Sequence, residues 1–222
     1  KVVNFKKIMH DIVDQLLLIK KEIQSNNSNA EVIAVSKTFS INKILPLINH
    51  GHVHYGENKI QEAVDKWTDI KRDFINIKLH FLGKLQTNKV KFAIPLFDYI
   101  HSLDSLKLAE KIANEQSKKK FKPKIFIQIN IGKEEQKNGI DIENLEKFYL
   151  DCIKNYDLNI IGLMCLPPND NDASIYFSEM LQLLKTTDLN ELSMGMTNDY
   201  IDALKFNSTF LRIGSKIFGP RS

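Results

Sequence analysis

Eight short apolar runs alternate with amphipathic stretches along nearly the whole chain, and this alternation constrains the fold more than any other feature. Short runs rich in Ile and Val are typical of buried parallel strands, and apolar residues spaced three and four apart are typical of helices. Repeated strand–helix units without a linker predict one closed (β/α)8 barrel of the TIM type, an α/β fold. The predicted strands are Val32–Val35, Val53–Tyr55, Leu79–Leu82, Tyr99–His101, Ile125–Asn130, Ile160–Met164, Glu191–Ser193 and Phe210–Ile213.

The stretches between and before these runs predict the helices. The helices between strands are expected at Ile41–Gly51, Ile60–Ile70, Ser105–Gln116, Ile142–Tyr156, Ala173–Leu184 and Asn198–Phe206. An extra amphipathic helix precedes the first strand, with one apolar face formed by Ile8, Ile12, Leu16, Ile19 and Ile23. A length of 222 residues suits one barrel and is short for two full domains. We therefore predict one domain over residues 1–222, in which residues 1–30 form a helix and loop that pack on the barrel.

Composition excludes several classes of protein. No apolar stretch approaches the length of a membrane span. A net charge of +4 does not require a nucleic-acid partner, and the basic run at 118–124 lacks an aromatic platform for RNA bases. Cys152 and Cys165 are the only cysteines, which fits a reducing compartment without disulfides. We expect a cytoplasmic protein that binds neither membranes nor nucleic acid.

Lys37 follows directly after the first predicted strand, in the segment Ala34-Val35-Ser36-Lys37-Thr38. Residues at the carboxyl ends of barrel strands form the face that carries the chemistry. A partly desolvated lysine amine at that face is a nucleophile toward aldehydes. Taken alone, the segment fits a solvated loop lysine better, so the prediction depends on what lies elsewhere in the chain.

Two glycine-containing turns are expected after the last two strands, at residues 193–197 and 212–215. Loops after strands seven and eight are the usual phosphate site of such barrels, and a helix N-terminus often completes it. The backbone N–H groups of Gly214 and Ser215 and the hydroxyls of Ser193 and Ser215 would bind a phosphate. Lys37 and this cradle would face each other across the mouth. A ligand with an aldehyde at one end and a phosphate at the other, such as pyridoxal 5′-phosphate (PLP), would bridge them.

Five motifs also resemble the pyridoxal phosphate homeostasis protein family. They are Ala-Val-Ser-Lys-Thr (34–38), Tyr-Gly-Glu-Asn-Lys-Ile-Gln-Glu (55–62), His-Phe-Leu-Gly-Lys-Leu-Gln-Thr-Asn-Lys (80–89), Leu-Ser-Met-Gly-Met-Thr-Asn-Asp (192–199) and Arg-Ile-Gly-Ser-Lys-Ile-Phe-Gly (212–219). The resemblance implies the fold-type III PLP barrel of alanine racemase, with the cofactor carried as a Schiff base on Lys37. It also implies a role in intracellular PLP and vitamin B6 homeostasis rather than robust catalytic turnover.

The resemblance implies further contacts to the cofactor. As in alanine racemase, Arg212 would point toward the pyridine nitrogen and disfavour its protonation. Direct binding of the phosphate by Arg212 is the alternative, and the sequence leaves both open. Asn58 is expected near the hydroxyl edge of the ring, and Met194 and Met164 against its face.

Two other functions compete with that of a carrier. A PLP-dependent amino-acid racemase or decarboxylase needs a second acid/base group, whereas Lys37 supplies one. The last predicted strand also ends close to Ser222, so we expect no second domain to cover the mouth. We therefore expect a monomeric carrier, with PLP-dependent apo-enzymes as the partners that such a role implies.

The second competitor is a metal-dependent hydrolase, suggested by the alternating His50, His52 and His54. His80 and His101 are isolated in the sequence, and His52 and His80 are expected at the wrong end of the barrel or outside it. We therefore expect no metal site.

Overall fold

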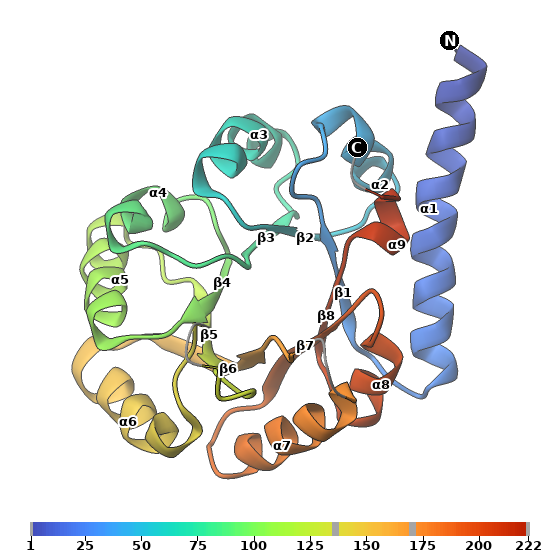
Figure 1. The fold of residues 1–222 in the computed structure, drawn as a ribbon. Helices are drawn as coiled ribbons and strands as arrows, with labels where there is room; N and C mark the ends of the chain where they lie inside the picture. The colour runs from blue at the N-terminus through green and yellow to red at the C-terminus, as the bar shows by residue number, and fades with distance from the viewer. Residues whose placement is uncertain (1, 135–137, 169–171, 221–222) are drawn as a thin grey trace.

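The computed structural model describes residues 2–134, 138–168 and 172–220, with side chains from Asp11 onward, and it is the predicted closed barrel (Figure 1). Every strand pairs in parallel with the next, and β8 closes onto β1 with Ile33 opposite Arg212. The strands are β1 (Glu31–Val35), β2 (His54–Glu57), β3 (Lys78–Phe81), β4 (Tyr99–Leu103), β5 (Lys124–Ile129), β6 (Asn159–Cys165), β7 (Glu191–Met196) and β8 (Phe210–Ile213).

Helices surround the strands, as the periodicity predicts. They are α1 (Val2–Ser25), α2 (Ile41–Asn49), α3 (Ile60–Asp73), α4 (Val90–Ala93), α5 (Leu106–Lys119), α6 (Leu145–Tyr156), α7 (Ala173–Lys185), α8 (Tyr200–Lys205) and α9 (Ser215–Phe218), with 3₁₀ turns η1 (Thr87–Lys89) and η2 (Ile142–Asn144). The sequence did not predict α4 or α9, because one helical turn is too short to show a periodic pattern.

Helix α1 lies along one side of the barrel, against α2, α8 and α9 (Figure 1). Its predicted apolar face is buried at Ile12, Leu16, Ile19 and Ile23, in the same core that packs the other helices on the strands. Ile8, predicted for the same face, lies outside the residues whose side chains are described.

A polar contact reinforces the position of α1. Lys216 Nζ on α9 lies 3.0 Å from Glu22 Oε2, which also accepts a hydrogen bond from the Tyr200 hydroxyl on α8. The N-terminal helix therefore supports the two short helices that follow the last two strands.

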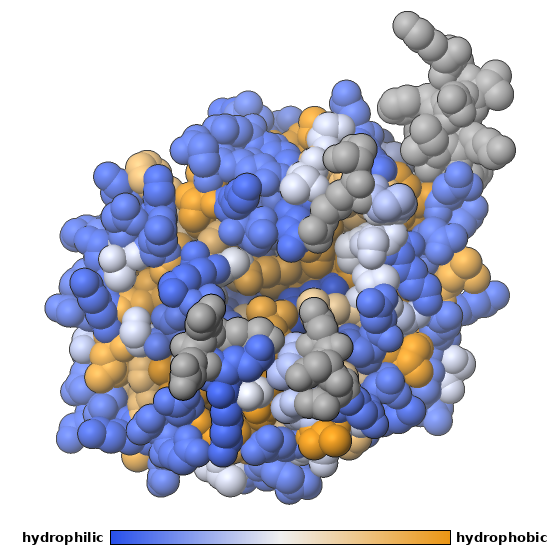
Figure 2. Space-filling model, viewed as in Figure 1, coloured by the Kyte–Doolittle hydropathy of each residue, from blue (hydrophilic) through white to orange (hydrophobic). Residues whose placement is uncertain are grey.

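The interior of the barrel holds a smaller apolar cluster, separate from the core between strands and helices. Its buried members are Ile33, Tyr99, Phe126, Met164 and Phe210. Filling by inward side chains is what keeps such a barrel from being an open pore. Figure 2 shows that the end of the barrel facing the viewer is hollowed at its centre, with hydrophobic residues inside and hydrophilic residues around them.

The structure corrects one prediction about β7. The turn expected at residues 193–197 is wrong, because the strand continues to Met196. Gly195 has φ of +90°, and the register between β7 and β8 shifts between Ser193 and Met196. A Cβ at Gly195 would lie 2.6 Å from the Ala203 Cβ, so glycine is required here for both conformation and space. The loop that reaches the mouth therefore starts at Thr197.

Candidate functional site

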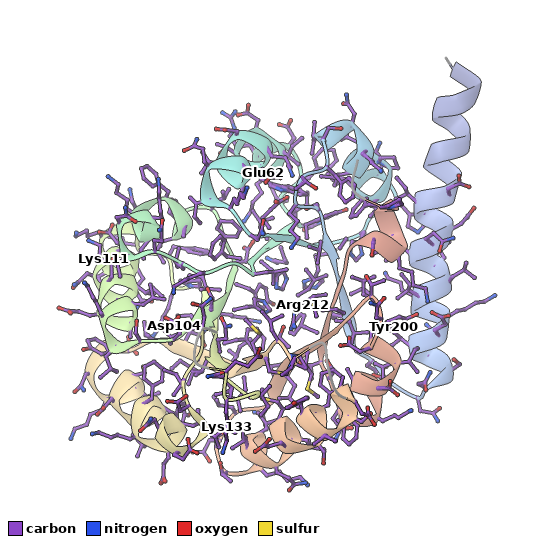
Figure 3. All side chains as sticks on the ribbon, in the orientation of Figure 1. Glu62, Asp104, Lys111, Lys133, Tyr200 and Arg212 are labelled. Carbon is purple, nitrogen blue, oxygen red and sulfur yellow. The ribbon has the colours of Figure 1, made fainter. Side chains whose placement is uncertain are left out.

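A cavity of about 470 Å³ opens at the carboxyl ends of the strands. Its size falls in the range of small-molecule sites, and its position is the one at which barrels of this type carry their chemistry. Five of the eight predicted contact residues line it: Lys37, Asn58, Arg212, Gly214 and Ser215. Figure 3 shows Arg212 near the centre of the barrel.

Lys37 lies in a tight turn just after β1, and both of its neighbours are held by hydrogen bonds. The Ser36 amide donates to the Gly56 carbonyl at 2.9 Å, and the Ser36 hydroxyl donates to Glu57 Oε1 at 2.8 Å. On the other side, the Thr38 amide donates to Glu62 Oε1 at 2.5 Å. The backbone of Thr38 is left-handed, with φ of 70°. The backbone of Lys37 is thus fixed on both sides.

Lys66 connects these contacts from α3. Its Nζ donates to Glu57 Oε1 at 2.9 Å, to Glu62 Oε1 at 2.9 Å and to the Ser36 carbonyl at 3.0 Å. Glu57 is fully buried and also accepts from Trp67 Nε1 at 2.9 Å. Burial raises the pKa of Glu57, and the charge of Lys66 and its hydrogen bonds oppose that rise. This cluster was not predicted, although the spacing of Glu62 and Lys66 on a predicted helix is a signal for a contact.

Asn58 is placed by a close approach of two backbones. A Cβ at Gly83 would lie 2.2 Å from the Asn58 carbonyl oxygen, so only glycine allows the segment after β3 to pack there. Gly83 itself lines the cavity beside Asn58. Part of the predicted motif at 80–89 therefore shapes the site through its backbone.

The predicted phosphate cradle lies at the start of α9. As in any helix, its first N–H groups have no acceptor within the helix. The Ser215 hydroxyl lies 3.3 Å from that of Thr197, so the loops after β7 and β8 meet at the cavity. Because β1 pairs with β8, Lys37 and this turn follow neighbouring strands. The expectation that they face each other across the mouth is wrong, since they lie side by side along its edge.

Arg212 is buried on β8 with its guanidinium bound to two other strands. NH1 donates to the Ser193 carbonyl at 2.5 Å and to the Ser193 hydroxyl at 2.8 Å, and NH2 donates to the Cys165 carbonyl at 2.7 Å. A guanidinium carries more N–H donors than these bonds use, so donors remain for a ligand in the cavity. Burial lowers the pKa of Arg212 from its ordinary value, yet an arginine stays charged.

The other three predicted contact residues lie outside the cavity lining. Ser193 is buried in the barrel beneath the cavity, in contact with Arg212. Met194 belongs to the core between strands and helices, because successive side chains of a strand alternate between its faces. Met164, also expected against the ligand, is buried in the interior cluster. The cavity is also lined by Val35, Leu82, Gly83, Lys84, Gln128, Asn138, Leu166, Met196, Thr197, Asn198 and Asp199, for which no contact with a ligand was predicted.

The histidines are arranged differently from the prediction. His80 and His101, which are isolated in the sequence, are in contact in the fold: His54 Nδ1 lies 2.9 Å from His80 Nε2, and His80 Nδ1 lies 2.9 Å from His101 Nε2. His52 is buried, and burial lowers its pKa to about 3. Within the described part of the chain, no group of three His, Cys, Asp or Glu side chains could hold a metal ion. No described helix combines the length and apolar character needed to cross a bilayer.

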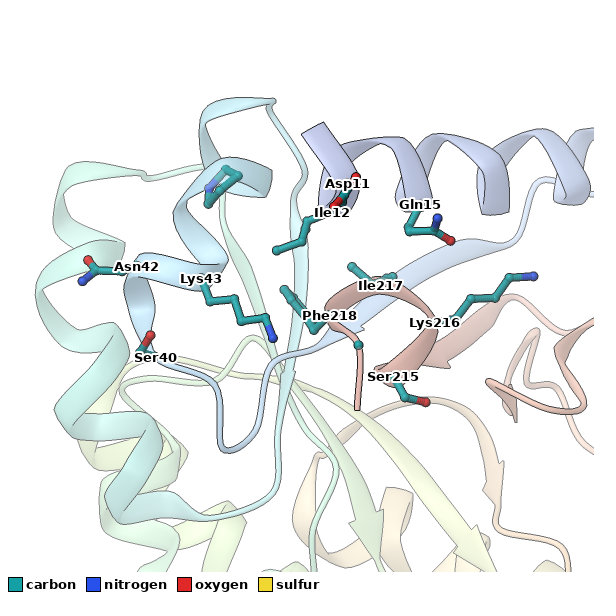
Figure 4. Close-up of a pocket in the computed structure, with 12 residues that line it drawn as sticks. Asp11, Ile12, Gln15, Ser40, Asn42, Lys43, Ser215, Lys216, Ile217 and Phe218 are labelled. Carbon is teal, nitrogen blue, oxygen red and sulfur yellow. The ribbon is translucent and has the colours of Figure 1, made fainter. Parts of the chain in front are cut away.

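A second cavity of about 600 Å³ lies between α1, α2 and α9, with Lys43 and Ser215 among its lining (Figure 4). It is enclosed by helices outside the ring of strands, whereas barrels carry their chemistry at the mouth that the strand ends form. We therefore assign the candidate site to the mouth of the barrel.

The family model described as alanine racemase, N-terminal domain, matches residues 12–222. Two curated relatives are named pyridoxal phosphate homeostasis protein. The one from Haemophilus influenzae is 36% identical over 212 residues, covering 91% of this chain and 90% of the relative. The one from Aquifex aeolicus is 35% identical over 201 residues, covering 86% and 87%.

Solved structures of similar proteins have the same fold. PipY of Synechococcus elongatus PCC7942, described with PLP bound, has a TM-score of 0.84 and 30% identity over 94% of this chain and all of its own. An alanine racemase of Clostridium difficile 630 has a TM-score of 0.71 at 12% identity, over 93% of this chain and 56% of its own. This second likeness concerns the fold alone.

Proposed function

This chain belongs to the pyridoxal phosphate homeostasis proteins, whose barrel is the alanine racemase N-terminal domain, and from that premise we propose that it binds pyridoxal 5′-phosphate at the mouth of its barrel. We propose further that it carries PLP as a Schiff base on Lys37 and keeps the intracellular supply of PLP and vitamin B6 in balance. The observation that carries the proposal is that Lys37, Arg212 and the Gly214–Ser215 turn line one cavity.

The chemistry of the donors fits PLP. An unprotonated Lys37 amine condenses with an aldehyde and releases water, which is how a lysine holds this cofactor. The first N–H groups of α9 and the hydroxyls of Ser215 and Thr197 suit a phosphate. Arg212 lies deeper, bound to carbonyls of β6 and β7, which supports a contact with the ring nitrogen rather than with the phosphate.

This arrangement would make bound PLP a weaker electron sink. Bound PLP supplies an aldehyde and an electron-withdrawing ring. A permanently charged donor such as Arg212 beside the ring nitrogen disfavours protonation of that nitrogen, and the ring then withdraws electrons less strongly. Asn58, whose backbone packs against Gly83, is proposed to contact the hydroxyl edge of the ring.

The test compares two lysines of the same cavity. Purified protein is loaded with PLP, its visible absorbance is recorded, and the imine is reduced with borohydride before mass spectrometry. Lys37→Ala is expected to lose both the visible band and the mass increase. Lys84→Ala is the matched control, because Lys84 also lines the cavity, and it is expected to keep both. A full band in Lys37→Ala would refute the attachment.

The alternative of an amino-acid racemase or decarboxylase shares the cofactor and differs in turnover. Loaded protein in deuterated water with single amino acids is expected to show no sustained exchange at Cα and no loss of carbon dioxide. Exchange at an enzyme-like rate would replace the carrier by a racemase.

We also propose that the carrier works in the cytoplasm as a monomer and delivers PLP to apo-enzymes. Two free, buried cysteines suit a reducing compartment. Loaded protein mixed with a PLP-dependent apo-enzyme is expected to restore its activity faster than spontaneous release of PLP from the carrier allows. Equal rates would show that PLP is simply released and then bound by the apo-enzyme. Sedimentation is expected to give the mass of a monomer, and the mass of a dimer would contradict the proposal.

A further inference from the structure

A line of polar side chains runs through the apolar interior of the barrel and ends at Arg212. His54 on β2, His80 on β3 and His101 on β4 are joined by ring-nitrogen contacts of 2.9 Å. His101 Nδ1 then lies 2.9 Å from the Ser193 hydroxyl, which lies 2.8 Å from Arg212 NH1. The line thus begins at the first residue of β2 and ends at a residue that lines the candidate site.

The direction of the hydrogen bonds follows from Arg212. A guanidinium only donates, so the Ser193 hydroxyl accepts from NH1 and must place its own hydrogen elsewhere. Among the contacts of this hydroxyl with described residues, His101 Nδ1 is the group able to accept. A buried hydroxyl hydrogen without an acceptor is costly, so Ser193 donates to His101.

The tautomers of the three histidines follow in turn. A neutral His101 that accepts at Nδ1 carries its hydrogen on Nε2, which then donates to His80 Nδ1. His80 likewise donates from Nε2 to His54 Nδ1. An extra proton on His101 or His80 would sit on Nδ1, the atom that accepts a hydrogen bond. Two hydrogens would then face each other in that contact, unless the donors along the whole line changed direction.

Burial and ring packing favour the same neutral state. His80 stacks on Tyr99 with ring centres 4.1 Å apart, and His101 stacks on Phe126 at 4.3 Å. Burial, the neighbouring histidines and the charge of Lys71 lower the pKa of His80, and burial with the charges of Arg212 and His54 lowers that of His101.

His54 is the least buried of the three. Burial also lowers its pKa, while the surrounding charges act in both directions: Lys78 and Lys124 lower it, and Glu31 and Asp98 raise it.

We propose that His54, His80, His101 and Ser193 are positioning residues for Arg212, joined to it in one unidirectional hydrogen-bond chain in which all three imidazoles are neutral Nε2–H tautomers. The chain fixes one side of the guanidinium, so that its remaining donors face the cavity. The identity of the ligand in that cavity rests on the proposed function, but the tautomers do not.

The first measurement needs no ligand. Protein labelled with ¹⁵N at histidine is examined by two-bond nitrogen–proton correlation, which separates the two neutral tautomers from the cation. Signals of the three interior histidines are assigned by loss in His54→Gln, His80→Gln and His101→Gln. All three are expected to show the Nε2–H pattern and to keep it across roughly pH 5–8.

The second measurement interrupts the hydrogen-bond chain next to Arg212. Ser193→Ala removes the donor to His101 and one acceptor of Arg212, and Ser193→Thr keeps a hydroxyl. Ser208→Ala is the matched control, since Ser208 is also buried and its hydroxyl donates to the Met194 carbonyl at 2.7 Å, outside the chain. Ser193→Ala is expected to change the His101 signal, shift the absorbance of bound PLP and weaken its affinity about fivefold, as for one lost hydrogen bond. Ser193→Thr and Ser208→Ala are expected to match the wild type in all three.

The outcomes separate this proposal from the proposed function. A His101 cation or Nδ1–H tautomer in the wild type would overturn the chain, as would a Ser193→Ala variant indistinguishable from Ser208→Ala. If no form of the protein binds PLP, the proposed function fails, while the histidine signals still decide whether the hydrogen-bond chain exists.

Discussion

Replacement of Lys66 by methionine tests whether the contacts around Lys37 are held by one buried ion pair. Methionine keeps most of the side-chain volume and removes the ammonium. Glu57 then remains buried with its charge unpaired, and the Ser36 carbonyl and Glu62 each lose a hydrogen bond. Breaking one partner of a buried pair costs about 3–5 kcal/mol, a large part of the roughly 5–15 kcal/mol by which domains are stable.

This cost translates into a measurable change in urea. With a denaturant slope of about 2–3 kcal/mol per molar, the unfolding midpoint of Lys66→Met is expected roughly 1–2 M below that of the wild type. Trp67 is the only tryptophan and donates to Glu57, so its fluorescence reports on the site itself. Arg72→Met on the same helix breaks an exposed pair with Asp69 and is expected to shift the midpoint little.

The dependence on pH gives a second check. Burial already raises the pKa of Glu57, and loss of Lys66 raises it further, because Lys66 lowers it. A carboxyl whose pKa is higher in the folded state keeps its stabilising effect below the unfolded pKa and loses it as pH rises through the folded pKa. The free energy of unfolding that Lys66→Met loses relative to the wild type is therefore largest at neutral pH and becomes smaller toward about pH 4.5. An unchanged midpoint at pH 7, or a deficit that grows on acidification, would refute the reasoning.

Two further predictions concern backbone and thiols. Gly83→Ala is expected to destabilise by about 1–3 kcal/mol and to weaken PLP binding, because its Cβ would lie 2.2 Å from the Asn58 oxygen. Gly214→Ala should be tolerated in a parallel urea titration, since its Cβ would lie 3.4 Å from the Val35 carbonyl oxygen; equal effects of the two changes would contradict this account. Burial raises the pKa of both Cys152 and Cys165 to about 12, so a thiol reagent should label them only after unfolding, and rapid labelling of native protein would show that they are exposed.

The barrel could be predicted because its signals are local. Each strand is a short apolar run, and each long helix carries its own periodic face, so the eight-strand order follows from the alternation. The boundary of β7 could not be read in the same way. Gly195 resembles a turn glycine in the sequence, whereas in the fold it relieves a contact with Ala203 on the next helix. That contact depends on how α8 packs, which the local pattern does not contain.

The residues of the site also fall into those with a local signal in the sequence and those without one. Lys37, Arg212 and Gly214 could be predicted because each follows or ends a strand, and all strand ends of a parallel barrel meet at one face. The buried line from His54 to Ser193 could not, because directly bonded members are up to 92 residues apart and each looks unremarkable alone. Lys66 reaches Ser36 across 30 residues for the same reason. Contacts between strands distant in sequence depend on barrel register, which only the closed structure supplies.

The pairing of β8 with β1 also has a consequence for biosynthesis. The Lys37 amine and the turn proposed to bind the phosphate follow β1 and β8, so a chain emerging from the ribosome acquires the turn only with the last strand of the barrel. If PLP binds as proposed, the growing chain lacks part of the binding site until β8 has paired with β1. Bound PLP would then report that the barrel has closed, and it would slow the separation of these two strands.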